Sequence, residues 1–207
     1  MQLASEEGNL LVKLARRAVE EYLRSGRIID PPEDLPKELM ERCGVFVTLN
    51  SFRHGKRELR GCIGFPYPTD PLARAVIESA INSATQDPRF LPISIEELDQ
   101  IIFEISVLTP PQLIRVEKPQ DYPSEIEIGQ DGLIVERGYH KGLLLPQVPV
   151  EWGWDVEEFL CHSCQKAGLP PDCWLTKGTR IHKFGCVIAQ ETTPGGKVAL
   201  KNTRDPH

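Results

Sequence analysis

The stretch Leu59-Arg60-Gly61-Cys62-Ile63-Gly64 predicts a strand with one reactive and one apolar face. At the two-residue period of a strand, Arg60 and Cys62 share one face, and Leu59 belongs to the opposite, core-facing set. A guanidinium beside a thiol favours the thiolate, which is the nucleophilic form. We therefore expect Cys62 to be a nucleophile or a ligand-facing thiol that Arg60 activates. The alternative is a cysteine that packs as a small hydrophobic residue.

Glycine inside a strand indicates that another backbone or a ligand approaches closely. Gly61 and Gly64 are therefore candidate substrate contacts on either side of the Cys62 thiol.

The segments around this stretch predict an α+β fold. Strand-like runs at 45–49 and 57–65 flank a polar turn and predict a hairpin. An amphipathic helix is expected at 8–25, and another helix begins at Pro71. The alternating run 101–108 is the clearest strand. Hairpins dominate, so we expect mostly antiparallel sheets in two lobes, with helices packed on them.

The second half of the chain predicts a further sheet and helix. Residues 126–128 and 133–137 flank an Asp131-Gly132 turn, which is a hairpin signal. A third strand is expected at 142–145. The last two elements are a helix that Asp155 caps and a strand at 179–190.

The organisation predicted for the chain is a single domain over residues 1–191. Its two lobes would meet at a proline-containing hinge near 116–125. Residues 192–207 are polar, contain two adjacent glycines, and are expected to form a flexible tail.

Composition and charge narrow the class of protein. The chain has 207 residues and a formal net charge of −6, which argues against broad nucleic-acid binding. No apolar run reaches the roughly 20 residues that span a bilayer. The first residues lack the basic and apolar regions of a signal peptide. A cytoplasmic protein with mostly reduced cysteines is therefore expected.

The sequence Asp87-Pro88-Arg89-Phe90 supplies further candidate site residues. Asp87 is a candidate base, or a group that orients Arg60. Arg89 is a candidate anion-binding side chain. The alternative is an ion pair that ends a helix. Arg60, the helix start at Pro71 and Arg89 together predict an anion site within hydrogen-bond reach of Arg60, with part of the segment 146–155 lining another side.

The segment 146–155 combines aromatic and polar residues between prolines and a helix cap. Such a mixture is typical of small-molecule pockets. Glu151 is a second candidate for proton transfer, and Gln147 and Trp154 are candidate substrate contacts. The alternative is burial of the tryptophans beneath the following helix.

Cys161 and Cys164 have the C-x-x-C spacing of some metal and redox sites. Their distance from Cys173 fits no standard zinc module, and Cys164 follows the apolar period of a helix. We therefore expect neither a metal nor another cofactor.

The hexapeptide resembles the signature of the AMMECR-one family, named after the Alport syndrome, midface hypoplasia and elliptocytosis chromosomal region. The resemblance, to a prokaryotic-type single-domain member, covers nearly the whole chain apart from about the last dozen residues. It continues through 87–90, 106–110, 132–135, 144–148, 151–154 and 167–170. It implies a compact two-part α+β protein in a metabolic or modification pathway, beside Memo-type or radical S-adenosylmethionine proteins.

The function expected from residues and resemblance together is that of an enzyme, or a catalytic pathway partner, acting on a small anionic substrate through a cysteine-containing cleft. One alternative is a non-catalytic ligand-binding protein or an adaptor for a Memo-type or radical S-adenosylmethionine enzyme. A weaker alternative is RNA binding through the basic edge from Arg53 to Arg60.

Overall fold

The computed structural model describes residues 3–53 and 55–202 and divides the chain into two compact units. The first unit runs to Leu108 and includes Val187–Lys201, and the second holds Thr109–Cys186. The hinge expected near 116–125 lies inside the second unit, where Pro119–Glu125 forms the 3-10 helix η3. The chain instead leaves the first unit just before Pro110 and Pro111, which cannot donate hydrogen bonds to a sheet.

The first unit contains a five-stranded sheet in the order β2-β1-β3-β8-β9. Antiparallel pairing joins β1 to both β2 and β3. The elements of this unit are α1 (Ser5–Ser25), η1 (Lys37–Met40), β1 (Val45–Arg53), β2 (Lys56–Phe65), α2 (Leu72–Thr85), η2 (Ile95–Gln100), β3 (Ile101–Leu108), β8 (Cys186–Glu191) and β9 (Val198–Asn202).

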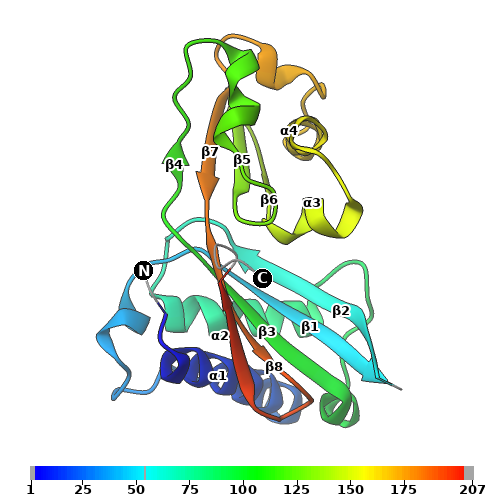
Figure 1. Ribbon diagram of the computed structural model, residues 1–207. Coiled ribbons are helices and arrows are strands. Elements are labelled where there is room, and N and C mark those ends of the chain that lie inside the picture. The colour runs from blue at the N-terminus through cyan, green and yellow to red at the C-terminus, as the bar shows by residue number, and fades with distance from the viewer. Residues whose placement is uncertain (1–2, 54, 203–207) are drawn as a thin grey trace. The chain divides into compact units, whose positions relative to one another are not determined.

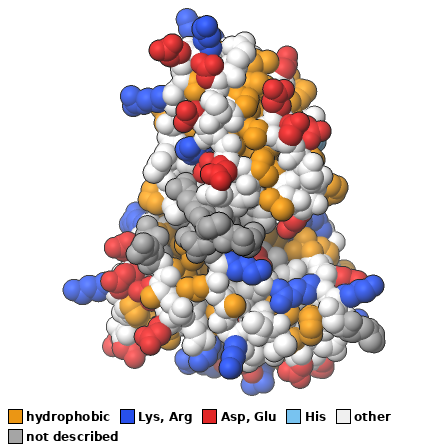
Figure 2. Space-filling view, in the orientation of Figure 1, with side chains coloured by type: hydrophobic (Ala, Val, Ile, Leu, Met, Phe, Trp, Pro, Cys, Tyr) orange, Lys and Arg blue, Asp and Glu red, His pale blue; other side chains and the backbone are white. Residues whose placement is uncertain are grey.

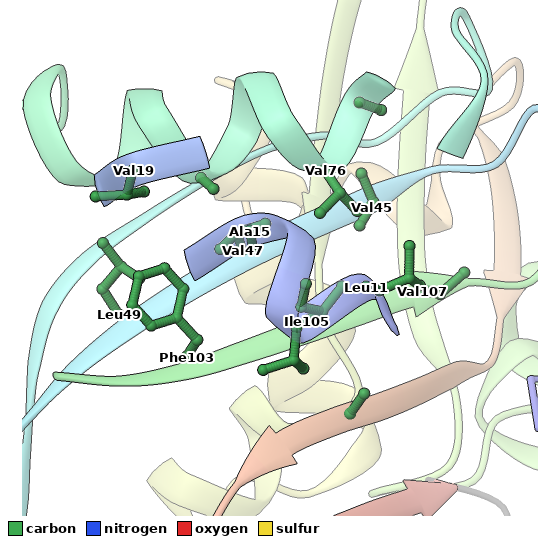
Figure 3. Packing of buried hydrophobic residues seen from close by; sticks show 14 of the residues in the cluster. Leu11, Ala15, Val19, Val45, Val47, Leu49, Val76, Phe103, Ile105 and Val107 are labelled. Carbon is green, nitrogen blue, oxygen red and sulfur yellow. The ribbon is translucent and has the colours of Figure 1, made fainter. Parts of the chain in front are cut away.

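Helices α1 and α2 cover one face of this sheet (Figure 1). Alternate residues of β1 and β3 point toward the helices, so Val47, Phe103 and Ile105 are fully or almost fully buried. They pack against α1 residues such as Leu11 and Ala15 (Figure 3). The apolar stripe of α1 and the strand alternation therefore form one core, and the opposite face of β1 and β2 carries half-buried residues.

Residues 192–202 differ from the expected flexible tail. The Thr192 N–H donates to the Lys197 carbonyl at 2.8 Å, and Val198–Asn202 returns as strand β9. The two glycines at 195 and 196 form the turn that this return needs, and Gly195 has a positive φ of 64°. The part of the predicted tail at 203–207 lies outside the described residues.

The second unit contains a four-stranded antiparallel sheet in the order β4-β7-β5-β6. Its remaining elements are helices. The bounds are β4 (Gln112–Leu113), η3 (Pro119–Glu125), β5 (Gly132–Arg137), β6 (His140–Leu144), α3 (Gln147–Trp152), α4 (Val156–Lys166), η4 (Cys173–Leu175) and β7 (Arg180–Phe184). Helix α4 packs on β5 and β6, and both units mix helices with antiparallel strands, so the α+β prediction is confirmed.

Two strand predictions in the second half are wrong. Residues 126–128 form no strand; the Glu127 N–H instead donates to the Asp131 carboxylate at 3.0 Å, which closes a turn before β5. The single strand expected at 179–190 is two strands that break at Gly185. These two strands, β7 and β8, belong to different sheets.

No helix in the described ranges is long and apolar enough to cross a bilayer. Basic and acidic side chains are interspersed on the face seen in Figure 2. Such mixing gives little support to a broad nucleic-acid surface.

Candidate functional site

Cys62 lies on β2, the edge strand of the first sheet, directly opposite Thr48 of β1. The Thr48 hydroxyl donates a hydrogen bond to the Cys62 sulfur at 3.3 Å. The thiol is half-buried, and burial raises its pKa above the ordinary value, although Thr48 and the Arg89 charge act in the opposite direction. The expected thiolate activation is therefore overcome by burial in the free protein.

The outer edge of β2 is bound by the carboxylate of Asp87. This carboxylate accepts the Cys62 backbone N–H at 2.8 Å and the Arg89 guanidinium at 2.7 and 3.0 Å. Arg89 also donates to the Cys62 carbonyl at 3.4 Å. Asp87 and Arg89 thus occupy the hydrogen-bonding groups that a neighbouring strand would take.

Asp87 is not suited to act as a base. Hydrogen bonds from Arg89 and from two backbone N–H groups lower the pKa of Asp87 to about 2, despite burial of its side chain. A carboxylate with this pKa stays ionised at neutral pH and is a poor proton acceptor. Its structural part is to fix the Cys62 backbone and the Arg89 guanidinium.

This pKa predicts an acid-sensitive contribution to stability. The folded pKa of Asp87 lies below the value of about 3.9 in an unfolded chain, so its contribution is complete above that pH and is lost as pH falls toward 2. We expect the free energy of unfolding of the wild type to fall by about 2 kcal/mol more than that of Asp87→Asn over this interval. Urea unfolding at several pH values measures the difference, with Asp70→Asn at an exposed site as the control. Parallel pH curves for wild type and Asp87→Asn would contradict the prediction.

Arg60 is not positioned as the activator of the thiol. It forms an ion pair with Glu97, with Nε–Oε1 and Nη2–Oε2 distances of 3.2 and 3.1 Å. Its guanidinium also donates to the carbonyls of Leu91 and Pro92. With 17% of its side chain exposed, Arg60 binds the segment after α2 to the sheet.

A β-bulge explains why the strand alternation failed at this point. The register pairs Leu49 with Gly61 but Asn50 with Leu59, which leaves Arg60 as the extra residue. A bulge shifts the alternation by one residue. Leu59 therefore belongs to the face of Cys62 rather than to the core, and 42% of it is exposed.

The space beside Gly61 and Gly64 is occupied by the protein itself, not by a ligand. A Cβ at Gly61 would lie 2.1 Å from the Ser83 carbonyl oxygen of α2, and one at Gly64 would lie 2.2 Å from the Val45 carbonyl oxygen. The Ser83 hydroxyl also accepts the Ile63 N–H and donates to the Val47 carbonyl. The two glycines therefore permit close packing of α2 and β1 on β2, and their part as substrate contacts stays a prediction.

The prediction that the N-terminus of α2 faces the thiol is also wrong. Ser83, near the C-terminal end of the helix, is the residue that contacts Gly61 and Ile63. The first residue, Leu72, is eleven positions away and donates its N–H to the Glu41 carbonyl, which places it about 16 Å along the axis. Arg89 is therefore the cation that remains beside Cys62.

Three polar residues near the thiol were missed by sequence analysis. Thr48 and Glu104 are cross-strand partners, so Cys62, Thr48 and Glu104 form one row across three strands. Glu97 binds Arg60. A strand pattern identifies which residues share a face but not which residues of other strands lie opposite them, so only the register could reveal Thr48 and Glu104. Glu97 lies on η2, so its contact with Arg60 depends on tertiary packing.

The other predicted site residues lie in the second unit, on or next to α3. Gln147 has a buried side-chain oxygen without a partner among the described atoms. Glu151 is exposed as a whole, and partial desolvation of its carboxyl group raises its pKa. Trp154 stacks on His162 with ring centroids 3.8 Å apart, and on Trp152 at 6.1 Å. These residues form their own cluster, and their participation in the Cys62 site stays a prediction.

The basic edge from Arg53 to Arg60 is largely bound within the first unit. Arg53 donates to Gln100, and Arg57 donates to Gln190 and to the Thr192 carbonyl. Arginines held in this way offer fewer free donors to phosphates, so the structure gives the RNA-binding alternative no added support.

Cys161 and Cys164 differ in how deeply they are buried. Cys164 is fully buried in the second core, and Cys161 is half-buried. Among residues 3–53 and 55–202, no group of three or more His, Cys, Asp or Glu side chains is arranged to hold a metal ion.

Comparisons with known proteins match nearly the full chain. The AMMECR1 family model matches residues 12–189. A protein of Pyrococcus abyssi is 56% identical over 204 residues, which cover 97% of this chain and 98% of the relative. A protein of Methanothermobacter thermautotrophicus is 57% identical over 189 residues, covering 91% and 96%. The crystal structure of the uncharacterized protein PH0010 from Pyrococcus horikoshii is similar with a TM-score of 0.91 and 54% identity, covering 98% of this chain and all of that one.

Proposed function

This chain belongs to the AMMECR1 family, and we propose that it is an enzyme, or a catalytic partner in a pathway, that acts on a small anionic substrate through Cys62. Arg89 binds the anionic group, and the Cys62 thiol is the nucleophile or acceptor. Asp87 is a positioning residue and Arg60 has only a structural role through Glu97, which replaces the base and activator roles predicted from the sequence.

The main support for this proposal is that the Arg89 side chain is held in place by Asp87 and is still exposed to solvent. One side of its guanidinium is fixed by Asp87, while 52% of the Arg89 side chain is exposed. A cation that is held in place and still accessible can bind a carboxylate or phosphate without first losing much side-chain freedom. Its charge also lowers the pKa of the neighbouring Cys62 thiol.

The Thr48 hydroxyl also stabilises the thiolate form of Cys62. It donates to the Cys62 sulfur, and a hydrogen bond from a hydroxyl stabilises a thiolate more than a thiol. When a substrate displaces water and is held at Arg89, proximity assists attack by a thiol whose pKa is high in the free protein.

Site-resolved alkylation tests the proposal. With iodoacetamide, we expect Arg89→Ala to slow modification of Cys62 by about three- to tenfold, because removal of the cation raises the thiol pKa and lowers the thiolate fraction. Arg60→Ala is the matched control and should change this rate less than twofold, because its charge is paired with Glu97. Mass spectrometry of Cys62 and Cys161, both half-buried, separates a local effect from unfolding. Equal rates in wild type and Arg89→Ala, or a larger effect of Arg60→Ala, would contradict the assigned roles.

A non-catalytic ligand-binding or adaptor role is the second candidate. It is favoured by the raised pKa of the Cys62 thiol and by the low pKa of Asp87, since neither group is then prepared for proton transfer. In that case Arg89 binds the ligand and Cys62 contributes only packing. The family resemblance implies that the partner of such an adaptor would be a Memo-type or radical S-adenosylmethionine enzyme.

Ligands retained by the purified protein distinguish the two candidates. Native mass spectrometry of the wild type and Cys62→Ser, after incubation with a metabolite extract, identifies the retained molecules. An enzyme should give a covalent adduct or a converted product with wild type only. An adaptor should retain the same unchanged molecule in both proteins, with loss of binding in Arg89→Ala.

A further inference from the structure

The second unit contains a pair of buried thiols that the Cys62 site does not use. Cys164 lies on α4 and Cys173 begins η4, and their exposed fractions are 0% and 1%. Both side chains belong to one hydrophobic cluster in which α4 packs against η4, and an interaction between the two thiols contributes to the raised pKa of Cys164. The Trp174 backbone N–H also hydrogen-bonds to Cys164. This pairing differs from the C-x-x-C pair that the sequence presents.

Backbone hydrogen bonds form the turns that connect α4 to η4 between the two cysteines. The Leu169 N–H donates to the Cys164 carbonyl at 3.0 Å, and the Cys173 N–H donates to the Pro170 carbonyl at 3.0 Å. Gly168, with a positive φ of 72°, ends the helix between them. These backbone hydrogen bonds turn the chain after α4, so that η4 packs back on the helix that carries Cys164.

Cys161 is placed differently. It is half-buried and lies one turn before Cys164 on α4, and it only packs against the edge of the cluster in which Cys164 and Cys173 are buried. Its proximity in sequence does not make it the partner of Cys164.

We propose that Cys164 and Cys173 form a disulfide that ties α4 to η4 when the protein meets a low-molecular-weight disulfide. One cysteine thiolate attacks a sulfur of that disulfide and releases one small thiol, forming a mixed disulfide. The second cysteine thiolate then attacks the mixed disulfide and releases the second small thiol. Two protein thiols are thus oxidised, one external disulfide is reduced to two thiols, and the two protons pass to the released thiolates.

Burial determines when this reaction occurs. Desolvation raises the pKa of both thiols, so exchange in the fully closed structure is slow. The bond forms during folding or local opening of η4, and afterwards it is shielded from reductants by the same burial. The product closes a short loop, and such a loop raises thermal stability by restricting the unfolded chain.

The experiment uses the full chain, refolded from denaturant with 2-hydroxyethyl disulfide as the oxidant and checked by circular dichroism. Free thiols are then alkylated in denaturant, and the protein is digested without reduction. Before alkylation, the intact product is expected to be about 2 Da lighter than the reduced chain and to melt several degrees higher. After alkylation and digestion, it should give a peptide linked between Cys164 and Cys173. Native protein incubated with the same oxidant should form this bond more slowly.

Two variants make the result specific. Cys161→Ser should form the linked peptide as the wild type does, and Cys173→Ala should lose both the link and the shift in melting temperature. A bond between Cys161 and Cys164, or refolded protein in which Cys164 and Cys173 both stay free or bound to the small thiol, would overturn the proposal. The Cys62 proposal is unaffected by any of these outcomes, because its readout is alkylation in the first unit.

Discussion

Replacing Gly61 with alanine is expected to destabilise the first unit by at least about 3 kcal/mol, at the upper end of the cost of overpacking a core. The added Cβ would lie 2.1 Å from the carbonyl oxygen of Ser83 and 3.0 Å from its carbonyl carbon. Neither backbone can yield easily, because β2 is paired with β1 and the Ser83 hydroxyl joins α2 to both strands. Relief of the clash requires the helix to move away from the sheet and exposes its buried small residues.

Urea unfolding followed by circular dichroism measures this effect. Gly26→Asn is the control, since Gly26 has open space around it and asparagine tolerates its positive φ of 72°. The control should change the free energy of unfolding by less than about 1 kcal/mol. If Gly61→Ala is as stable as the control variant, the close approach of α2 to β2 is wrong.

The second large effect is expected at the buried ion pair between Arg16 of α1 and Glu191 of β8. Two hydrogen bonds of 2.6 and 2.8 Å join the side chains, and Glu191 also accepts the Phe103 N–H at 3.0 Å. Only 4% of the Glu191 side chain is exposed. Glu191→Ala leaves a guanidinium and a backbone N–H without their acceptor, and we expect a loss of about 3 to 5 kcal/mol in the free energy of unfolding.

A surface ion pair in the same helix provides the matched comparison. Arg24 and Glu20 are 2.6 Å apart with 63% and 41% of their side chains exposed, so Glu20→Ala should cost no more than about 0.5 kcal/mol. Restoring shape without charge in the double variant Arg16→Met with Glu191→Leu should recover part of the loss. Equal effects of Glu191→Ala and Glu20→Ala in urea unfolding would contradict the structural importance of the buried pair.

The parts of the fold that follow from local patterns were predictable from the sequence. The amphipathic stripe of α1 and the alternation of β3 each repeat over several turns or residues, so packing had little freedom to override them. The hinge position and strand β9 were not predictable in this way. Both depend on which distant segments pair. The residues of β9 also lack the regular alternation of apolar and polar side chains that would predict a strand.

Some members of the candidate site were predictable, but their roles were not. Asp87 and Arg89 were expected near Cys62, and the structure brings all three together. The bulge at Arg60 could not be read from the sequence, because it depends on cross-strand register. Its partner Glu97 is 37 residues further along the chain. The strand period therefore predicted Arg60 beside the thiol, where the structure has Arg89.

The central claim is that Arg89 makes Cys62 selective for anionic electrophiles. The direct measurement is the ratio of the rate constants for iodoacetate and iodoacetamide at Cys62, in wild type and in Arg89→Gln at low ionic strength. The two reagents differ in charge at similar size, so the ratio reports the local potential independently of thiol burial. The wild-type ratio is expected to exceed that of Arg89→Gln by at least about threefold and to fall with added salt. A ratio unchanged by Arg89→Gln, or by salt, would contradict an anion-binding function at this site.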